Sequence, residues 1–410
     1  MIKRIYSELL RRKLTAFPVI AVLGSRQAGK TTLVKEELAG WKYFDLQRPS
    51  DRAPFEADPE ARLEQLGLNF ILDEAQSMPE LFPIIRGFID RKRSCKGQMV
   101  LLGSASFELV KNISESLAGR IGFIELPPFQ WVELNQYSKD CTINELWCKG
   151  GYPEPFLMKD TNNVSDWFDA YTRTFIERDL SSLGIDFDFH HMRKFMTMLA
   201  HINAEQWNAS KIGSALGINY QTVNRYLYIL EKSFLVRRIP AYHANLGKRL
   251  IKAEKIYYRD TGLLHYFLGI KNETDLSVSP ERGSSWESFC VEQIINSFTY
   301  RSSNTRFYHM RTAGGAEVDL IADTGKERYL FEIKLHSSPE KDMCRGLKSC
   351  MNDLKVRRGF IVYPGKDTYS LGDDVSTLPI ADLLEKVDYP MVPSDKVAEN
   401  RCAQKRIIRT

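Results

Sequence analysis

The chain has 410 residues, of which 43% are hydrophobic and 27% are charged, and its formal net charge at pH 7 is +5. This length exceeds what one hydrophobic core usually organises, so we expect two or three globular domains and exclude a largely disordered chain. The 7 cysteines include no Cys-x-x-Cys pair, which is typical of reduced thiols rather than of a disulfide framework or a zinc site. Because no segment resembles a signal peptide or a membrane span, we predict a cytoplasmic protein without membrane contact.

The N-terminal third of the chain alternates short apolar segments with helical patterns. Residues 2–13 have the basic amphipathic pattern of a helix, and an apolar strand at 18–23 leads through a glycine-containing loop into a second helix. Further strands are predicted at residues 41–46, 69–74, 98–104 and 120–126. Since strands that alternate with helices form parallel sheets covered on both faces, we predict an α/β domain over residues 1–130.

Residues 24–31 read Gly-Ser-Arg-Gln-Ala-Gly-Lys-Thr, which fits the phosphate-loop pattern G-x-x-x-x-G-K-[ST] between a strand and a helix. Glycines let backbone N–H groups surround phosphates, Lys30 supplies a cation to the β and γ oxygens, and Thr31 offers a hydroxyl to Mg²⁺. ATP and Mg²⁺ are therefore the predicted cofactors. The residues expected to contact the nucleotide are Gly24, Ser25, Arg26, Gln27, Ala28, Gly29, Lys30, Thr31 and Thr32. The alternative is a glycine-rich turn with an incidental lysine.

A pair of acidic residues, Asp73 and Glu74, ends the apolar strand at 69–74. Ligands of open α/β sheets bind at the carboxyl ends of the strands. We predict that Asp73 holds the Mg²⁺ shell and that Glu74 polarises the attacking water. Such a pair also commonly caps the following helix, which is the alternative interpretation.

Other polar residues near predicted strand ends are candidates for sensing the γ-phosphate. Ser104 ends the strand at 98–104, although an ordinary turn serine gives the same pattern. Arg120 stands at the start of the strand at 120–126 and is the predicted arginine that stabilises transition-state charge. Arg26 and Arg178 compete with it for this role.

After Pro128 the pattern becomes mainly helical. We predict a helical connector or lid over residues 131–200, a winged helix-turn-helix over 201–275, and a small α/β domain over 276–392. The remaining residues, 393–410, are polar and basic and are expected to form a flexible tail.

The middle of the chain concentrates positive charge, with 11 Lys and Arg against 3 Asp and Glu between His190 and Lys255. The residues predicted to contact DNA grooves and phosphates are Asn219, Tyr220, Gln221, Thr222, Asn224 and Arg225 in the second helix, and Arg237, Arg238, Lys248 and Arg249 in the wing. The alternative is a packing or protein-contact module whose basic residues form a solvated face.

Acidic residues also recur near the C-terminal end. Asp319 lies on one predicted strand, Glu332 and Lys334 share a face of the next strand, and Glu287 lies on the preceding helix. Two carboxylates and a lysine on a hairpin, completed by Glu287, can hold a divalent metal ion and orient a water molecule. This resembles the core of the PD-(D/E)xK nucleases. The alternatives are a simple ion pair between Glu332 and Lys334, or a remnant kept for binding.

The segments GSRQAGKTTL, FILDEAQ, LLGSASFEL and LAGRIGFIEL together resemble bacterial and archaeal AAA-type ATPases that carry a C-terminal domain called DUF4143. Later segments resemble the same family in the same order, namely YTRTFIERDL, KIYYRDTGLL, WESF, AEVDL and EIK. The resemblance covers the chain up to about Pro364. It implies an ATPase core with an additional strand between the phosphate-loop strand and the Asp73 strand, then a winged helix and a restriction-endonuclease-like end. Related ATPases often act as rings, so a homo-oligomer is possible.

These observations favour a DNA-associated ATPase whose nucleotide turnover changes the conformation of the winged helix and the nuclease-like domain. A second hypothesis is an ATP-dependent molecular switch that binds a protein partner without DNA. A third is a metal-dependent DNA nuclease gated by ATP.

Overall fold

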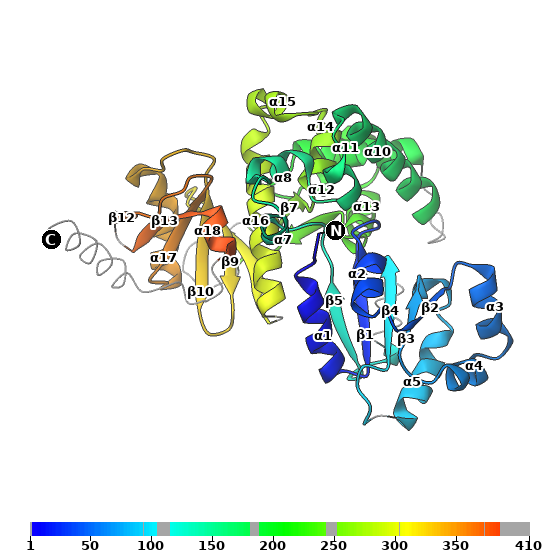
Figure 1. Ribbon diagram of the computed structural model, residues 1–410. Helices are drawn as coiled ribbons and strands as arrows, with labels where there is room; N and C mark the ends of the chain where they lie inside the picture. The colour runs from blue at the N-terminus through cyan, green and yellow to red at the C-terminus, as the bar shows by residue number, and fades with distance from the viewer. Residues whose placement is uncertain are drawn as a thin grey trace, which may run out of the picture.

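In the computed structural model, the N-terminal third of the chain forms a five-stranded sheet whose strands are all parallel (Figure 1). The described residues are 2–92, 94–104, 115–180, 188–242, 252–302, 304–372 and 374–385. The strands are β1 (Val19–Gly24), β2 (Lys42–Asp45), β3 (Phe70–Asp73), β4 (Met99–Ser104) and β5 (Ile121–Glu125), in the order β2-β3-β4-β1-β5. Strand β4 therefore separates β1 from β3, as the family resemblance implied, and the predicted α/β class is confirmed.

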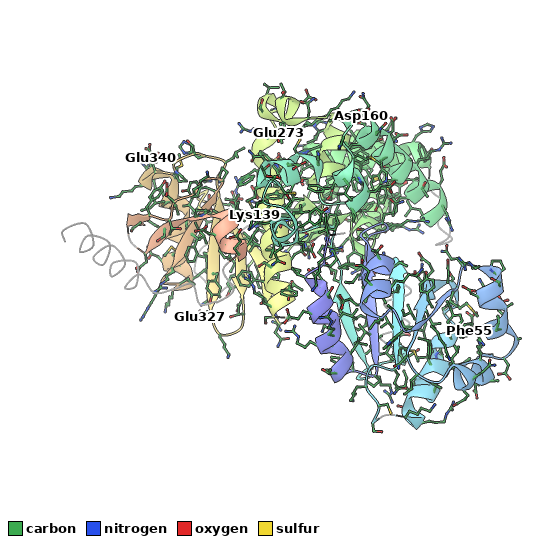
Figure 2. All side chains as sticks on the ribbon, viewed as in Figure 1. Phe55, Lys139, Asp160, Glu273, Glu327 and Glu340 are labelled. Atoms are coloured by element: carbon green, nitrogen blue, oxygen red, sulfur yellow. The ribbon has the colours of Figure 1, made fainter. Side chains whose placement is uncertain are left out.

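Helices cover both faces of this sheet. Successive residues of β1 point to opposite faces, so they belong to two different cores. Val19, Ala21 and Leu23 face one core and Ile20 and Val22 face another. The first core contains α3 (Pro49–Ala57), α4 (Pro59–Leu66) and α5 (Leu81–Arg91), and the second contains α1 (Tyr6–Ala16) and α2 (Lys30–Glu37). Phe55 of α3, labelled in Figure 2, is only 1% exposed in the first core.

The middle of the chain is a group of helices with one small ribbon. Its elements are α7 (Trp131–Tyr137), α8 (Ile143–Lys149), α9 (Pro153–Leu157), α10 (Thr161–Thr174), the π-helical turn η2 (Phe175–Asp179), α11 (Phe189–His201), α12 (Ala209–Leu216), α13 (Tyr220–Lys232), β6 (Val236–Ile239), β7 (Lys255–Tyr258), α14 (Thr261–Leu268) and α15 (Glu273–Val278). Strands β6 and β7 are antiparallel, and we call this pair the ribbon. Residues of α10, α11, α13, α14 and the ribbon share one core, so the predicted connector and helix-turn-helix segments pack as one body.

The C-terminal domain has a mixed six-stranded sheet in the order β12-β13-β11-β10-β9-β8. Its elements are α16 (Arg282–Arg301), β8 (Arg306–Arg311), β9 (Glu317–Asp323), β10 (Arg328–Ile333), η4 (Lys341–Cys344), α17 (Arg345–Leu354), β11 (Gly359–Tyr363), β12 (Ser370–Gly372), β13 (Val375–Pro379) and α18 (Ile380–Glu385). Strands β8, β9 and β10 are antiparallel neighbours, whereas β10, β11 and β13 run parallel. Sequence analysis predicted the helix that carries Glu287 and the strands that carry Asp319 and Glu332, which are α16, β9 and β10.

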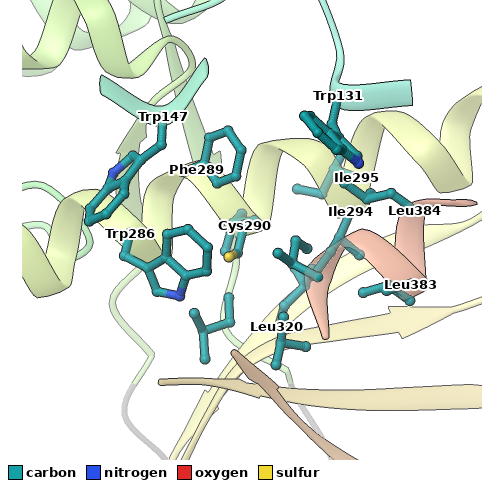
Figure 3. Packing of buried hydrophobic residues seen from close by; sticks show 14 of the residues in the cluster. Trp131, Trp147, Trp286, Phe289, Cys290, Ile294, Ile295, Leu320, Leu383 and Leu384 are labelled. Carbon is teal, nitrogen blue, oxygen red and sulfur yellow. The ribbon is translucent and has the colours of Figure 1, made fainter. Parts of the chain in front are cut away.

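Helix α16 joins the middle helices to the C-terminal sheet, as Figure 3 shows. Trp286 of α16 meets Trp147 of α8 with ring centroids 5.0 Å apart, and Trp147 Nε1 donates to Ser285 Oγ at 2.9 Å. Further along α16, Ile294 belongs to the same core as Leu320 of β9. Because this apolar core continues from one side of α16 to the other, the C-terminal domain is packed onto the middle helices rather than tethered to them.

No helix in the described ranges is both long and apolar enough to cross a membrane. The cysteines in those ranges are free thiols. The predicted tail at 393–410, the predicted DNA contacts Lys248 and Arg249, and the side chain of Ser104 lie outside the described residues.

Candidate functional site

The loop between β1 and α2 has the local geometry that a phosphate-binding loop requires. At Gly24, a Cβ atom would lie 2.3 Å from the carbonyl oxygen of Leu126, so only glycine fits. Gly29 precedes α2 with a φ of 94°, a left-handed conformation that glycine adopts without strain. Lys30 is only 8% exposed, and its ammonium group donates to the carbonyl oxygens of Gly24 and Ser25 at 3.0 and 2.8 Å. The structure thus places a cation and a helix N-terminus at one point, which suits a phosphate group.

The side chain of Arg4 connects this loop to more distant segments through hydrogen bonds. Sequence analysis did not predict these contacts. The Nη1 atom of Arg4 donates to the carbonyl oxygen of Ala28 at 2.8 Å, its Nη2 to that of Pro127 at 2.6 Å, and its Nε to Glu133 Oε1 at 2.8 Å. Arg4 and Glu133 are 5% and 1% exposed, so this ion pair is shielded from solvent. No local pattern marks it, because its partners belong to segments far apart in the sequence.

Thr31 and Asp73 meet at the carboxyl edge of the sheet. Thr31 Oγ1 donates to Asp73 Oδ2 at 2.8 Å, and the hydroxyl of Tyr43 on β2 donates to the same oxygen at 2.6 Å. Burial, followed by the hydrogen bond to Asp73, raises the pKa of Tyr43 far above its usual value. Hydroxyl and carboxylate oxygens are the ligands that Mg²⁺ prefers, so Thr31 and Asp73 fit the predicted ion. Tyr43, which orients Asp73, was not predicted.

Glu74 follows Asp73 in an unusual backbone conformation. Its φ of 54° and ψ of 42° lie in the left-handed region, which is uncommon for residues other than glycine. Its carboxylate accepts a hydrogen bond from Gln76 Nε2 and does not cap the short helix η1 (Ala75–Ser77). The structure therefore does not support the alternative that Glu74 caps the next helix. Such strain is often found at functional sites.

The other predicted nucleotide contacts lie around the same loop. Ser104 pairs with Gly24 in the register of β4 and β1, so its backbone lies at the same edge of the sheet. The remaining loop residues differ in exposure: Ser25 and Ala28 are buried, Arg26 is half-buried, and Gln27 and Thr32 are exposed. The predicted nucleotide contacts thus share one edge of the sheet.

Arg120 lies at the opposite edge of the sheet. Its carbonyl oxygen accepts a hydrogen bond from the backbone N–H of Val19, the first residue of β1, at 3.2 Å. Strand β1 runs from there to Gly24, a distance of about 16 Å at 3.3 Å per residue. Its guanidinium group donates to both carboxylate oxygens of Asp90, at 2.7 and 2.9 Å. This geometry is inconsistent with the predicted role of Arg120 at the phosphates of its own chain.

Arg178, one of the two competing arginines, lies near the carboxyl edge of the sheet. It lies in the π-helical turn η2, and its Nη2 donates to Gln47 Oε1 at 2.9 Å. Gln47 lies two residues after the end of β2, and the intervening residue, Leu46, donates its N–H to the carbonyl oxygen of Asp73 at 3.0 Å. Arg178 is thus the better placed candidate to stabilise transition-state charge.

We therefore expect Arg178→Ala to lower the turnover number for ATP at least about tenfold. Arg120→Ala is the matched control, and its turnover is expected to stay within about twofold of the unaltered protein. Steady-state phosphate release by both variants checks this. The assignment is wrong if Arg120→Ala is the slower enzyme, a result that would instead indicate an arginine supplied to a neighbouring subunit.

The carboxyl edge of the sheet also contacts the ribbon and α16 through charged groups. Arg259 donates to Glu125, the last residue of β5, and to Glu292 Oε2 of α16 at 3.3 Å. Arg237 of β6 donates to Glu292 through two nitrogens, and its Nη2 lies 3.5 Å from Glu125 Oε1. We call these four residues the interdomain ion network. It borders a cavity of about 350 Å³ between β5 and the ribbon.

The predicted DNA-contacting residues divide into two groups. Gln221, Asn224 and Arg225 are exposed on one side of α13, and Tyr220 at its start is 53% exposed. Asn219 instead caps α13, since its Oδ1 accepts from the N–H of the half-buried Thr222 at 2.7 Å. Asn224 Oδ1 accepts from Trp207 Nε1 at 2.9 Å, so the exposed Tyr220, Gln221 and Arg225 are the residues on this helix face that remain available to a partner.

The ribbon arginines predicted to bind DNA phosphates are engaged within the chain. Arg237 belongs to the interdomain ion network, and Arg238 pairs with Glu231 at 2.6 Å and with Glu254 at 3.3 Å. Neighbouring carboxylates raise the pKa of both guanidinium groups although burial opposes this. The prediction that these two arginines serve as free phosphate contacts therefore fails in this conformation.

The predicted C-terminal residues come together around a lysine that was not predicted. Lys255 of β7 places its Nζ 3.0 Å from Glu287 Oε1, 3.0 Å from Asp319 Oδ1 and 2.7 Å from Glu317 Oε1. Lys334 Nζ lies 2.7 Å from Glu332 Oε1, which is the ion pair considered as an alternative. We call Glu287, Glu317, Asp319 and Glu332 the carboxylate cluster.

Burial and mutual repulsion strongly perturb this cluster. Burial, and then the charge of Asp319, raise the pKa of Glu287 to about 7 and that of Glu332 to about 8. Burial alone would raise the pKa of Asp319, but Lys255 holds it below the usual range. Burial opposes a charged Lys255, yet Tyr257 and the carboxylates raise its pKa well above normal. The charged form of Lys255 is therefore favoured beside Asp319.

The carboxylate cluster does not fit a divalent metal ion in this arrangement. Within the described ranges, no group of three or more His, Cys, Asp and Glu side chains is arranged to hold a metal. Glu287 and Asp319 are two of the three predicted ligands, and one carboxylate oxygen of each accepts a hydrogen bond from Lys255. The predicted metal site at Glu287, Asp319 and Glu332 is therefore not formed here, because the ammonium group of Lys255 lies between two of its carboxylates, those of Glu287 and Asp319.

Comparison with known families follows the three parts of the fold. The AAA domain family matches residues 16–135, and DUF8612, a domain of unknown function, matches residues 141–274. DUF4143, also a domain of unknown function, matches residues 282–383. The first match contains the phosphate loop and Asp73, the second contains Lys255, and the last contains the whole carboxylate cluster.

Sequence relatives match long stretches of the chain. An uncharacterized protein of Mycobacterium tuberculosis is 37% identical over 377 residues, which are 92% of this chain and 83% of that protein. An uncharacterized protein of Haemophilus influenzae is 23% identical over 299 residues. Among solved structures, a Walker-type ATPase of Pyrococcus abyssi is 18% identical with a TM-score of 0.44, covering 65% of this chain and 96% of its own. The chain therefore belongs to the family of AAA-type ATP-binding proteins with a C-terminal DUF4143 domain.

Proposed function

We propose that this protein hydrolyses ATP with Mg²⁺, and that its nucleotide state is transmitted to the helix-turn-helix segment and the C-terminal domain, with DNA as the partner. The observation that carries the ATPase proposal is the convergence of Lys30, Thr31 and Asp73 at one edge of the parallel sheet. These are the three groups that a magnesium nucleotide requires.

Each residue has a distinct task in this reaction. The loop N–H groups and the helix N-terminus bind the phosphates, and Lys30 moves its hydrogen bonds from Gly24 and Ser25 to the β and γ oxygens. Thr31 and Asp73 would hold Mg²⁺, which neutralises phosphate charge when it is bound. Glu74, beside Asp73, orients the attacking water. Rearrangement of Lys30 and Thr31 on nucleotide binding is the local change that starts the signal.

The interdomain ion network supports the proposed transmission. Glu125 lies opposite Leu23 in the register of β5 and β1, so it neighbours the phosphate loop. Asp260 supports the same path, since its carboxylate accepts the N–H of Gly151 at 2.7 Å and that of Leu263 in α14 at 2.9 Å. Pro153, two residues after Gly151, lies 3.8 Å from where a Cβ of Gly29 would be. Movement of the phosphate loop would therefore be transmitted to the ribbon through the contacts of Glu125, Asp260 and Pro153.

ATP turnover measured with and without duplex or single-stranded DNA tests this function. We expect DNA to stimulate turnover, because α13 and the phosphate loop are linked through the shared core and the ion network. Unaltered turnover would favour the protein-binding switch. If calorimetry in magnesium buffer shows that the folded protein binds neither ATP nor GTP, the ATPase proposal itself is wrong.

The exposed face of α13 carries the DNA part of the proposal. Arg225→Ala is expected to weaken retention on duplex DNA severalfold and to lower the slope of log affinity against log salt by about 1, because one phosphate contact is lost. Arg306→Ala, an exposed arginine on β8, is the matched control and should bind DNA normally. Equal binding by both variants at every salt concentration would remove α13 from the interface.

A further inference from the structure

Lys255 enters the carboxylate cluster from outside the C-terminal domain. It is the first residue of β7, and only 4% of its side chain is exposed. Its ammonium group contacts carboxylates from two different elements, Glu287 of α16 and Glu317 and Asp319 of β9. A buried cation that contacts three carboxylates is the arrangement that a metal centre would otherwise have.

One hydrogen-bond acceptor of the carboxylate cluster is unused. Glu332 is 7% exposed, and its Oε2 atom has no hydrogen-bond partner among the described groups. By contrast, Asp319 Oδ2 is satisfied by the N–H of Ile333 at 2.9 Å, and Asp319 Oδ1 by Lys255 at 3.0 Å. A buried carboxylate oxygen without a partner is costly, so it points to an occupant that the present arrangement excludes.

A divalent ion could not share this position with Lys255. An ion bound by Glu287 Oε1 and Asp319 Oδ1 would lie about 2.0–2.6 Å from those oxygens. Both oxygens are also 3.0 Å from Lys255 Nζ. The two cations would then be only a few ångströms apart in a buried site, where their repulsion is strong. The two occupants are therefore mutually exclusive.

We propose that Lys255 acts as a built-in cation that occupies the metal position of the carboxylate cluster and keeps this centre closed to divalent metal ions. Lys255 belongs to the ribbon rather than to the C-terminal domain. At the other end of β7, Arg259 contacts Glu125 of the ATPase sheet. Withdrawal of Lys255 therefore requires movement of β7, which is held at both ends. While Lys255 contacts the carboxylate cluster, its ion pairs hold the ribbon against the C-terminal domain.

Mn²⁺ binding to the full-length protein without nucleotide tests this inference, read by calorimetry and by electron paramagnetic resonance of bound Mn²⁺. Lys255→Met is expected to gain one Mn²⁺ site at least about tenfold tighter than any cluster binding in the unaltered protein. Adding Asp319→Asn to Lys255→Met should abolish that site. Lys334→Met is the matched control, because it removes a positive charge from the same cluster but leaves Lys255 on Glu287 and Asp319; it should gain no site.

Two results with folded protein would overturn the inference. One is the absence of a new Mn²⁺ site in folded Lys255→Met, and the other is binding in the unaltered protein that Asp319→Asn removes. If Lys255→Met does not fold alone, MnCl₂ must restore its folding and raise its melting temperature, since the ion replaces the missing charge. If Mn²⁺ neither restores folding nor raises the melting temperature, the inference is also wrong. The inference does not rest on ATP turnover, so its failure leaves the proposed function standing.

Discussion

Lys30→Ala is expected to lower the rate of ATP hydrolysis at least about a hundredfold, the usual effect of removing one preorganised group from a charge-stabilising site. Lys30 is positioned for this task before nucleotide binds, because Gly24 and Ser25 hold its ammonium group within the loop at 3.0 and 2.8 Å. Alanine keeps the helix, since it has the highest helix propensity. The variant should therefore fold normally and lose the cation that neutralises the β and γ oxygens.

Phosphate release by purified proteins measures this effect, and calorimetry with Mg²⁺ and ATP reports binding separately. Lys139→Ala is a matched control, because Lys139 is an exposed lysine remote from the loop (Figure 2). It should retain full turnover. If Lys30→Ala hydrolyses ATP as fast as Lys139→Ala, the loop is a glycine-rich turn without a catalytic role.

The ATPase part of this site could be predicted because its signals are local. Lys30 and Thr31 lie within one motif, and Asp73 ends a short apolar strand, so pattern and strand direction together place them at one edge. Arg4 and Tyr43 could not be found in this way, since their roles depend on which distant segments pack together. Sequence periodicity indicates that β2 forms, but not that its tyrosine hydroxyl reaches Asp73.

Strand direction could also have placed Arg120 away from the phosphates of its own chain. This residue precedes β5, and in a parallel sheet the amino ends of all strands lie at the edge away from the ligand. Arg178 follows a long helix, and only tertiary packing brings it to Gln47. The error came from weighing the nearness of Arg120 to a strand without asking which end of that strand it occupies.

The C-terminal cluster shows a different limit. Asp319, Glu332 and Lys334 could be grouped from a hairpin pattern with period two, and Glu287 from the preceding helix. Lys255 belongs to a ribbon more than thirty residues before Glu287, in a segment whose positive charge suggested DNA. A local excess of charge cannot reveal that some cations neutralise buried carboxylates of another domain. Arg237 was misjudged for the same reason, because it pairs with Glu292 of α16, whereas Arg238 pairs with Glu231 and Glu254 of its own segment.

Glu292→Ala is expected to lower the free energy of unfolding by about 3–5 kcal/mol, because it removes one partner from a buried ion network. The side chain of Glu292 is 5% exposed, and those of Arg259 and Arg237 are 7% and 20% exposed. Without Glu292, both guanidinium groups retain only Glu125 within the network, and they repel each other. Differential scanning calorimetry should show a lower melting temperature, whereas Glu36→Ala on the exposed side of α2 should change stability by no more than about 0.5 kcal/mol.

The same variant separates stability from transmission. Glu292 lies on α16 and does not belong to the phosphate loop, so Glu292→Ala should still bind Mg²⁺ and ATP at a temperature where it is folded. In the unaltered protein, ATP should slow amide hydrogen exchange in α16 and β9, because the network passes a change at β5 to the C-terminal domain. This distant protection should disappear in Glu292→Ala while protection of α2 persists. Equal protection of α16 in both proteins would show that the signal travels through the apolar core around Trp147 and Trp286 instead.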